Sequence, residues 1–212
     1  MTRRAYIERI RRLIYGSQPP SEANITVGLV NNYLSDAIAV AAKTNYTDNL
    51  KLEGIASVNN SFYTTFKSLA VVTDDQFLWK ITLPQIPVGI GGIEGISKVV
   101  LKDSSSPQLS YPVVLLTENQ ASFQKGMREI PNKLIGYPEG EFVYIQSTLL
   151  LSDYTAQATM VSGGISSDLD STLNVPSDYF PVMNEYLLRI LMVQKNQIQD
   201  VTNDGSDIVR ST

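Results

Sequence analysis

The side chains that could carry acid–base chemistry in this chain are mainly carboxylates, because its 212 residues include neither histidine nor cysteine. Histidine is the side chain most used for proton transfer near neutral pH, and both residues are common metal ligands. Without cysteine the chain also has no disulfide bond and no thiolate nucleophile. An enzyme would have to work with carboxylates, lysine, tyrosine or hydroxyl groups alone. We therefore expect no enzymatic activity, no catalytic residue, no cofactor and no metal ion.

Three pairs of carboxylates lie close enough in sequence to share a proton or to bind a cation. They are Asp74 with Asp75, Asp168 with Asp170, and Asp204 with Asp207. Residues 200–205 also resemble the first half of a calcium loop, but Thr202 and Ser211 stand where an EF-hand requires acidic or amide ligands. We interpret all three pairs as solvated turn residues. A carboxylate-dependent hydrolase remains a remote alternative.

A glycine-rich stretch at residues 83–95 suggests phosphate binding at first sight. Gly89 and Gly91 are followed by Glu94, where the dinucleotide fingerprint requires glycine. The next residues predict a strand rather than a helix, so no helix N-terminus is available to hold a phosphate. We interpret the stretch as a loop between strands whose apolar side chains would need cover from another subunit. The candidate inter-subunit contacts in it are Ile86, Val88, Ile90 and Ile93.

The first 16 residues are strongly basic, with five arginines against one glutamate in a chain of net charge −4. The helical spacing of Tyr6, Ile10 and Leu13, with Ile7 and Ile14 beside them, places an apolar stripe opposite the arginines. This pattern is typical either of a helix that touches nucleic acid or an acidic partner, or of a surface helix with a solvated face. The candidate docking segment consists of Arg3, Arg4, Arg9, Arg11 and Arg12.

Residues 174–200 predict a helix that begins near Ser177 or Asp178, whose side chains could cap its first turn. Apolar residues recur at helical spacing from Met183 onward. Further apolar side chains lie off that stripe, at Leu188, Met192 and Val193. A helix that is apolar on more than one side must be covered on more than one side. These three residues are therefore further candidates for contact with another subunit.

The whole pattern predicts an α+β fold, in which N-terminal helices and a C-terminal helix pack with an antiparallel sheet or sandwich. Helices are expected at 2–15 and about 23–46, and from about residue 61 the apolar period changes to two. The expected parts are a helical part at 1–60, an antiparallel β part at 61–165, and the C-terminal helix and tail at 166–212, forming one composite domain. No apolar run is long enough to predict a membrane span or anchor.

The expected strands cover 61–72, 77–83, 96–101, 111–117, 133–137, 141–146 and 154–160, with a short helix at 118–129. The only tryptophan, Trp79, is predicted to be a core residue of the second strand. A tight turn at 138–140 predicts a hairpin between the fifth and sixth strands.

Particular strings are spread over nearly the whole chain. They are LVN at 29–31 before an alanine-rich stretch, NSFYTTF at 60–66, TLPQIPVGI at 82–90, REIPN at 128–132, NVPSDYFP at 174–181 and QDVTNDG at 199–205. With the order of elements, they resemble a virion structural protein family of crAss-like tailed bacteriophages. None of the strings is a catalytic motif, so the resemblance implies a structural role and assigns no chemistry.

The architecture is also similar to head-to-tail connector or gatekeeper ring proteins of short-tailed phages, which is an argument from fold alone. The resemblance implies a homo-oligomeric ring, twelvefold beneath the portal, in the neck or upper tail of the virion. Its partners would be further copies, the portal, adjacent neck or tail rings, and genomic DNA passing through the lumen without sequence-specific binding. A tail-tube adaptor or a head decoration is the alternative among virion proteins. We expect a soluble chain that is made in the host bacterial cytoplasm.

Overall fold

The computed structural model describes residues 1–20, 23–75, 77–90, 95–106, 108–125, 134–147, 151–163 and 167–201. The chain divides into two compact units, residues 1–41 with 164–212 and residues 42–163. We call them the helical unit and the barrel unit. The sequence predicts three consecutive parts, whereas in the structure both ends of the chain belong to the helical unit. The boundary after residue 41 falls inside a helix rather than at residue 60.

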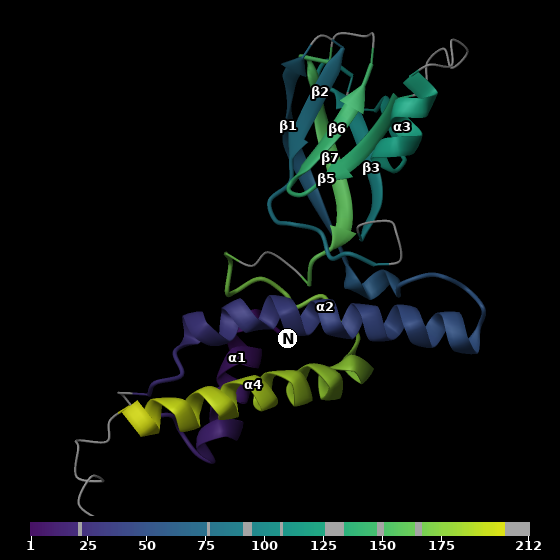
Figure 1. The fold of residues 1–212 in the computed structure, drawn as a ribbon. Helices are drawn as coiled ribbons and strands as arrows, with labels where there is room; N and C mark the ends of the chain where they lie inside the picture. Colours follow the sequence, from purple (N-terminus) through teal and green to yellow (C-terminus); the bar gives the residue numbers. More distant parts are fainter. Residues whose placement is uncertain are drawn as a thin grey trace, which may run out of the picture. The chain divides into compact units, whose positions relative to one another are not determined.

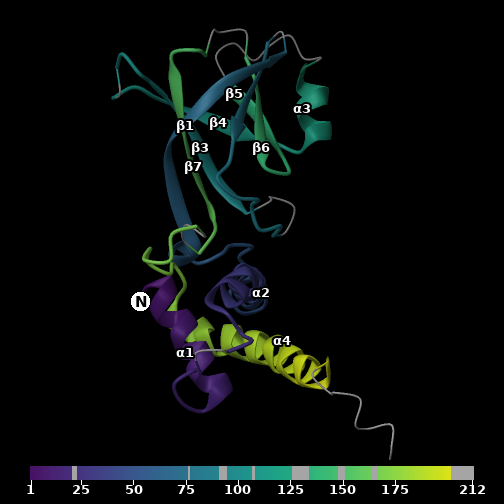
Figure 2. The ribbon, with the colours of Figure 1, turned by 90° about the vertical axis from the view of Figure 1, so that its left-hand side faces the viewer.

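The helical unit contains α1 (Arg3–Tyr15), the first part of α2 (Val27–Leu52) and α4 (Phe180–Val201) (Figures 1 and 2). The three predicted helices are therefore confirmed. Within the described chain, no helix combines the length and the hydropathy that a bilayer span requires.

Helix α1 begins at a side-chain cap and ends at a glycine. The hydroxyl of Thr2 accepts a hydrogen bond from the Ala5 amide at 3.3 Å, and Gly16 adopts a left-handed φ of 68°. The predicted apolar stripe is partly wrong, because Leu13 is 49% exposed. The buried face instead consists of Tyr6, Ile7, Ile10 and Ile14. Positions 7, 10 and 14 follow the three- and four-residue spacing of one helix face.

Helix α2 extends to Leu52, beyond the end that was expected near residue 46. Asn45 is buried, and its side-chain oxygen accepts a hydrogen bond from the Asn59 amide at 2.8 Å. The side-chain amide of Asn49 donates to the Ser57 carbonyl at 3.0 Å. These asparagines bind the segment that follows the helix, so their side chains do not compete for the helix backbone.

Helix α4 follows a 3-10 turn, η2 (Ser177–Tyr179). The predicted cap by Ser177 or Asp178 is wrong, because both residues lie inside this turn. Pro176 is the N-cap residue of η2 and makes no side-chain cap hydrogen bond. The buried face of α4 consists of Met183, Leu187 and Leu191.

The two ends of the chain meet through backbone hydrogen bonds within the helical unit. The Arg3 amide donates to the Ser171 carbonyl at 3.1 Å, and the Leu173 amide donates to the Met1 carbonyl at 2.9 Å. Tyr6 on α1 donates its hydroxyl to the Asn184 side chain on α4 at 2.7 Å. The unit thus depends on contacts between residues more than 160 positions apart.

The barrel unit contains seven strands and one described short helix. The strands are β1 (Tyr63–Asp75), β2 (Leu78–Thr82), β3 (Ile96–Asp103), β4 (Ser110–Leu115), β5 (Leu134–Glu139), β6 (Phe142–Gln146) and β7 (Tyr154–Val161). A 3-10 turn, η1 (Asn60–Phe62), precedes β1, and α3 (Glu118–Lys125) lies between β4 and β5. The mixed α+β class is confirmed, and every predicted strand is found.

The strands close into one barrel in the order β1-β2-β6-β5-β4-β3-β7. The structure therefore has a closed barrel where a sheet or sandwich was expected. Strand β1 pairs with β7 along its first part and with β2 along its last part. The register shifts between Phe66 and Leu69, where Ser68 has a φ of 59°. Such an irregularity bends a strand and lets it join two neighbours. The expectation of a purely antiparallel sheet is wrong, because β4 and β5 run parallel.

The barrel interior is apolar. Trp79, 6% exposed, belongs to its core, which confirms the prediction for this residue. The β5–β6 hairpin is also confirmed, and Gly140 in its turn has a φ of 59°, which glycine adopts without strain. Further core residues come from all seven strands and include Phe66, Ile81, Leu101, Val113, Leu134, Ile145 and Met160.

Candidate interaction surfaces

Among the described residues, the carboxylate pairs that could have carried chemistry are engaged in local structure. Asp168 accepts a hydrogen bond from the Asp170 amide at 2.9 Å, and Asp170 forms an ion pair with Arg4 at 2.8 Å. The hydrogen bond and charge of Arg4 lower the pKa of the Asp170 carboxyl. Asp74 binds the Lys80 ammonium at 2.7 Å. Asp204 and Asp207 lie outside the described residues.

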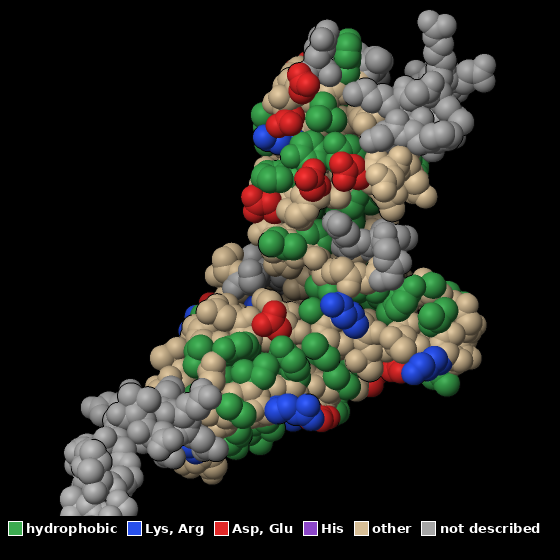
Figure 3. Space-filling view, viewed as in Figure 1, with side chains coloured by type: hydrophobic (Ala, Val, Ile, Leu, Met, Phe, Trp, Pro, Cys, Tyr) green, Lys and Arg blue, Asp and Glu red, His purple; other side chains and the backbone are tan. Residues whose placement is uncertain are grey.

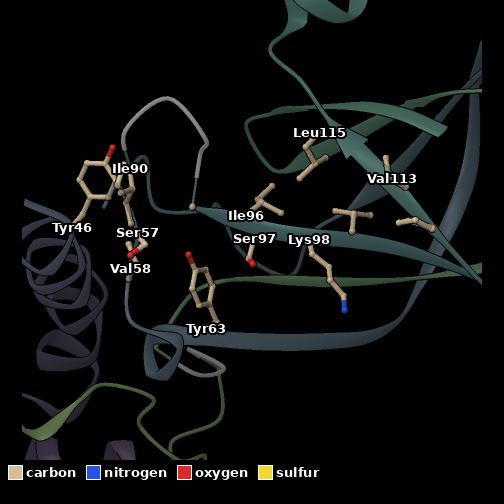
Figure 4. A pocket seen from close by; sticks show the side chains of 14 residues that line it. Tyr46, Ser57, Val58, Tyr63, Ile90, Ile96, Ser97, Lys98, Val113 and Leu115 are labelled. Atoms are coloured by element: carbon tan, nitrogen blue, oxygen red, sulfur yellow. The ribbon is translucent and has the colours of Figure 1, made fainter. Parts of the chain in front are cut away.

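A pocket of about 430 Å³ opens on the barrel unit (Figure 4). Tyr46 from the end of α2 lies near Ile90 and the 57–58 segment at one end of the pocket, and Ile96 with Leu115 lies toward the other end. Its volume falls within the range of small-ligand sites. The described lining combines apolar side chains with a few polar ones.

The polar side chains of this pocket can all donate hydrogen bonds, and the hydroxyls among them can also accept. They are the hydroxyls of Tyr46, Ser57, Tyr63 and Ser97 and the ammonium of Lys98. Burial raises the pKa of Tyr63 further above its ordinary value of 10.0, at which the hydroxyl is already protonated near neutral pH. Among the described lining residues there is no carboxylate that could act as a general base. The pocket could hold a neutral or anionic group, but this lining shows no arrangement for proton abstraction.

The five arginines of the predicted docking segment have different roles. Arg3 is fully buried, and its Nε and Nη2 donate to the Asn31 side-chain oxygen at 3.3 and 3.1 Å. Burial lowers the pKa of its guanidinium. The prediction that Arg3 takes part in docking is therefore wrong, because a buried guanidinium cannot meet a partner.

Two further arginines are engaged within the helical unit. Arg4 pairs with Asp170, as described above. Arg11 binds Glu8 at 2.9 Å and donates from Nε to the Ile25 carbonyl at 3.0 Å. Both side chains are thus held by partners of the same unit.

Arg9 and Arg12 remain exposed on α1. Among the residues that the structure describes, neither guanidinium has an ion-pair partner within 4.0 Å. Together with Ala5, Glu8 and Leu13 they line a surface groove of about 410 Å³. We call the exposed side chains of Ala5, Arg9, Arg12 and Leu13 the basic face of α1. It is the part of the predicted docking segment that is open to a partner.

The proline- and glycine-rich loop is less exposed than its sequence suggests. Ile86 is 69% exposed and Val88 is half-buried, whereas Ile90 is only 7% exposed and lines the pocket of the barrel unit. Ile93 lies outside the described residues. The proposed role of Ile90 as an inter-subunit contact is therefore wrong, because its side chain is already covered within its own unit.

The outer surface of α4 keeps the apolar residues that were singled out. Met192 and Val193 are exposed, and Leu188 is half-buried. On the same helix, the side-chain amide of Gln194 donates a hydrogen bond to the hydroxyl of Tyr33 on α2 at 2.5 Å. The exposed pair is thus available for contact, while its neighbour Gln194 joins α4 to α2.

The barrel carries an aromatic surface that was not predicted from the sequence. Tyr137 on β5 and Tyr144 on β6 stack with ring centroids 5.3 Å apart, and Phe142 lies 6.2 Å from Tyr144. Lys80 on β2 lies over the Phe142 ring at 5.5 Å. The predicted hairpin at 138–140 places Tyr137 opposite Tyr144, so the stack could have been predicted from the turn register.

No protein family model matches this chain, and no curated protein matches it either.

Proposed function

We propose that the protein is a structural subunit of a bacteriophage virion that forms an oligomeric ring in the neck or upper tail. The observation that carries this proposal is the presence of exposed, clustered apolar side chains in both units. Met192 and Val193 are adjacent on α4, and Leu50, Leu52 and Ile55 follow one another closely at the end of α2. Leu52 is 85% exposed. Single exposed apolar residues are ordinary, but neighbouring ones favour a protein contact.

A ring requires two different surfaces on each copy, because each subunit meets its neighbours through head-to-tail contacts. Separate apolar groups on the helical unit and the barrel unit meet this requirement. By the family resemblance, the ring would be a dodecamer beneath the portal, with the portal and adjacent neck or tail rings as partners. Genomic DNA would pass through its lumen, and a net charge of −4 would limit non-specific attraction to phosphates.

A structural role also agrees with the environment of the described carboxylates. Asp74 and Asp170 are engaged by Lys80 and Arg4, and Asp168 closes a turn. A hydrolase would need a carboxylate held beside a substrate cleft. The described pocket of the barrel unit offers only hydroxyls and an ammonium.

The proposal is tested by the mass of the purified chain, alone and mixed with the portal protein of the same phage, followed by location of the chain in the particle. We expect a ring-sized oligomer and density at the neck or upper tail. Density on the capsid surface would instead favour a head decoration, and density along the tube a tail-tube adaptor. A strictly monomeric chain that binds no virion component would contradict the proposal.

The loop residue Ile86 offers a sharper test of assembly. Because its side chain is largely exposed, Ile86→Asp should change the free energy of unfolding by no more than about 0.5 kcal/mol. If the loop is an inter-subunit contact, the same change should shift the oligomer toward monomer in light scattering. Ile90→Asp is the matched contrast, because placing a carboxylate at a buried position should destabilise the barrel unit itself. Unchanged assembly in Ile86→Asp would remove the loop from the interface.

A further inference from the structure

The outer side of the barrel carries an aromatic surface with two carboxylates beside it. Strand registers place Tyr137 opposite Tyr144, and Tyr144 opposite Lys80, on three adjacent strands. We call Tyr137, Phe142 and Tyr144, with Glu118 and Glu139, the aromatic face. Figure 3 shows acidic side chains among hydrophobic ones on the side of the barrel where β2, β6 and β5 lie in Figure 1.

The β5–β6 register pairs Glu139 with Phe142 and Tyr137 with Tyr144 on one face of the hairpin, and Glu118 begins α3, which contacts β5. Burial raises the pKa of Tyr137, and the charges of Glu139 and Glu118 raise it further. Both carboxylates are exposed, and within the described chain neither has a cation within 4.0 Å. Lys80 does not neutralise them, because it is bound to Asp74 at 2.7 Å. The face therefore combines half-exposed ring surfaces with negative charge that has no ion-pair partner there.

Such a surface is complementary to arginine. A guanidinium is attracted to the face of an aromatic ring and forms paired hydrogen bonds with carboxylates. The basic face of α1 presents two guanidinium groups, Arg9 and Arg12, one helical turn apart, with the aliphatic side chain of Leu13 beside them. Two exposed carboxylates on one surface thus match two exposed guanidinium groups on the other.

We propose that the basic face of α1 in one copy docks on the aromatic face of the barrel in the next copy. This inference rests on the proposed ring and names two surfaces that would join its subunits. The two surfaces are different, so the contact is head-to-tail and can repeat around a closed ring. Nucleic acid is the less favoured partner of the arginines, because it would leave the complementary aromatic face unused.

The test uses two charge-reversed full-length variants. In the first, Arg9→Glu with Arg12→Glu makes the face of α1 acidic. In the second, Glu118→Arg with Glu139→Arg makes the barrel face basic. Each variant alone would place like charges in contact, so its dissociation constant for self-association should rise about 100-fold or more. Sedimentation velocity over a concentration series measures this change.

An equal mixture of the two variants decides the proposal. In the mixture, every acidic α1 can meet a basic barrel and every basic α1 an acidic barrel, so assembly should return to within about threefold of wild type. The charge-matched control is Lys43→Glu with Lys67→Glu, which changes exposed lysines on α2 and β1 and should assemble as wild type does. Trp79 fluorescence and helical circular dichroism verify that each variant is folded.

The contact is overturned if either reversed variant assembles like wild type, or if the mixture fails to regain assembly. If the wild-type chain forms an oligomer and both reversed variants assemble in the same way, this contact is excluded and the proposed ring still stands. A wild-type chain that stays monomeric at every concentration would overturn the contact, and the ring would then depend on the location of the chain in the particle.

Discussion

The helical unit and the barrel unit are stabilised in different ways. The helical unit is assembled from the two ends of the chain, and polar side chains join its helices across long sequence separations. Examples are Arg3 with Asn31, Tyr6 with Asn184 and Gln194 with Tyr33. The barrel unit is a continuous stretch, residues 42–163, whose strands close around an apolar core. Both units have apolar cores, but the helical unit also joins its helices through specific polar partners, whereas the barrel unit relies on packing and strand register.

The single tryptophan makes this comparison measurable. Trp79 lies in the barrel core, so its fluorescence reports unfolding of that unit. Far-ultraviolet circular dichroism at the helix band reports chiefly the helical unit, because α1, α4 and much of α2 belong to it. If the units unfold independently, the two signals should follow different denaturant transitions.

The largest expected effects come from truncating one core residue in each unit. Leu187 on α4 and Ile81 on β2 are both fully buried. Leu187→Ala and Ile81→Ala should each lower the free energy of unfolding by about 2–5 kcal/mol. Leu187→Ala should shift the circular dichroism transition, and Ile81→Ala the fluorescence transition. Equal shifts of both signals in both variants would show that the units unfold as one.

The buried arginine tests the polar character of the helical unit. Arg3→Ala removes a guanidinium that binds the Asn31 oxygen in a buried setting, so we expect a loss of about 1.5–3 kcal/mol in the helical transition. Arg9→Ala is the control, because its exposed side chain should contribute less than about 0.5 kcal/mol. Similar denaturation midpoints for the two variants would contradict the distinction between them.

Close packing in the barrel is tested at Gly136 on β5. A Cβ added there would lie 2.8 Å from a methyl group of Val113 and 2.9 Å from the Tyr144 carbonyl oxygen. Gly136→Ala should therefore cost about 1–3 kcal/mol, seen in the fluorescence transition. Gly89→Ala is the matched control, because nothing lies within 4 Å of the added Cβ. Equal stability of the two variants would show that β5 can shift to accommodate the methyl group.

The smallest effect concerns the exposed ion pair of Arg4 and Asp170. Arg4 lowers the pKa of Asp170 below the value of 3.8 expected for a free aspartate. The pair therefore stabilises the helical unit above pH 3.8, and this contribution is lost as the pH falls through the lower pKa of the folded state. Asp170→Asn should remove that pH dependence and cause only a slight loss at neutral pH. A helical transition with the same acid dependence in both proteins would contradict this role.

Local structure was largely predictable from the sequence. Apolar spacing identified the three long helices and all seven strands, and the 138–140 turn identified the β5–β6 hairpin. These features depend on neighbours a few residues away. The parallel β4–β5 pair and the closure of the barrel depend on pairing between distant strands, which the alternation of side chains within each strand does not encode.

The candidate surfaces show the same limit. Val193, which lies off the apolar stripe of α4, is exposed, and so is Ile86 in the proline- and glycine-rich loop. Ile90 of the same loop is instead covered by its own unit. The aromatic face could have been predicted in part, because the hairpin register aligns Tyr137 with Tyr144. Glu118 comes near Tyr137 only because α3 begins where β4 ends and β5 returns beside β4.

The arginines of α1 show what each level of structure determined. The sequence by itself determined a basic helix with one apolar face, and the three-residue spacing of Glu8 and Arg11 allowed their ion pair. Only the tertiary structure brought Asn31 to Arg3 and Asp170 to Arg4, across 28 and 166 residues. The spacing of apolar residues predicts which side of a helix is buried. The partner of a charged side chain instead depends on which residues the tertiary fold places next to it. Arg9 and Arg12 remain exposed on α1 in that tertiary arrangement.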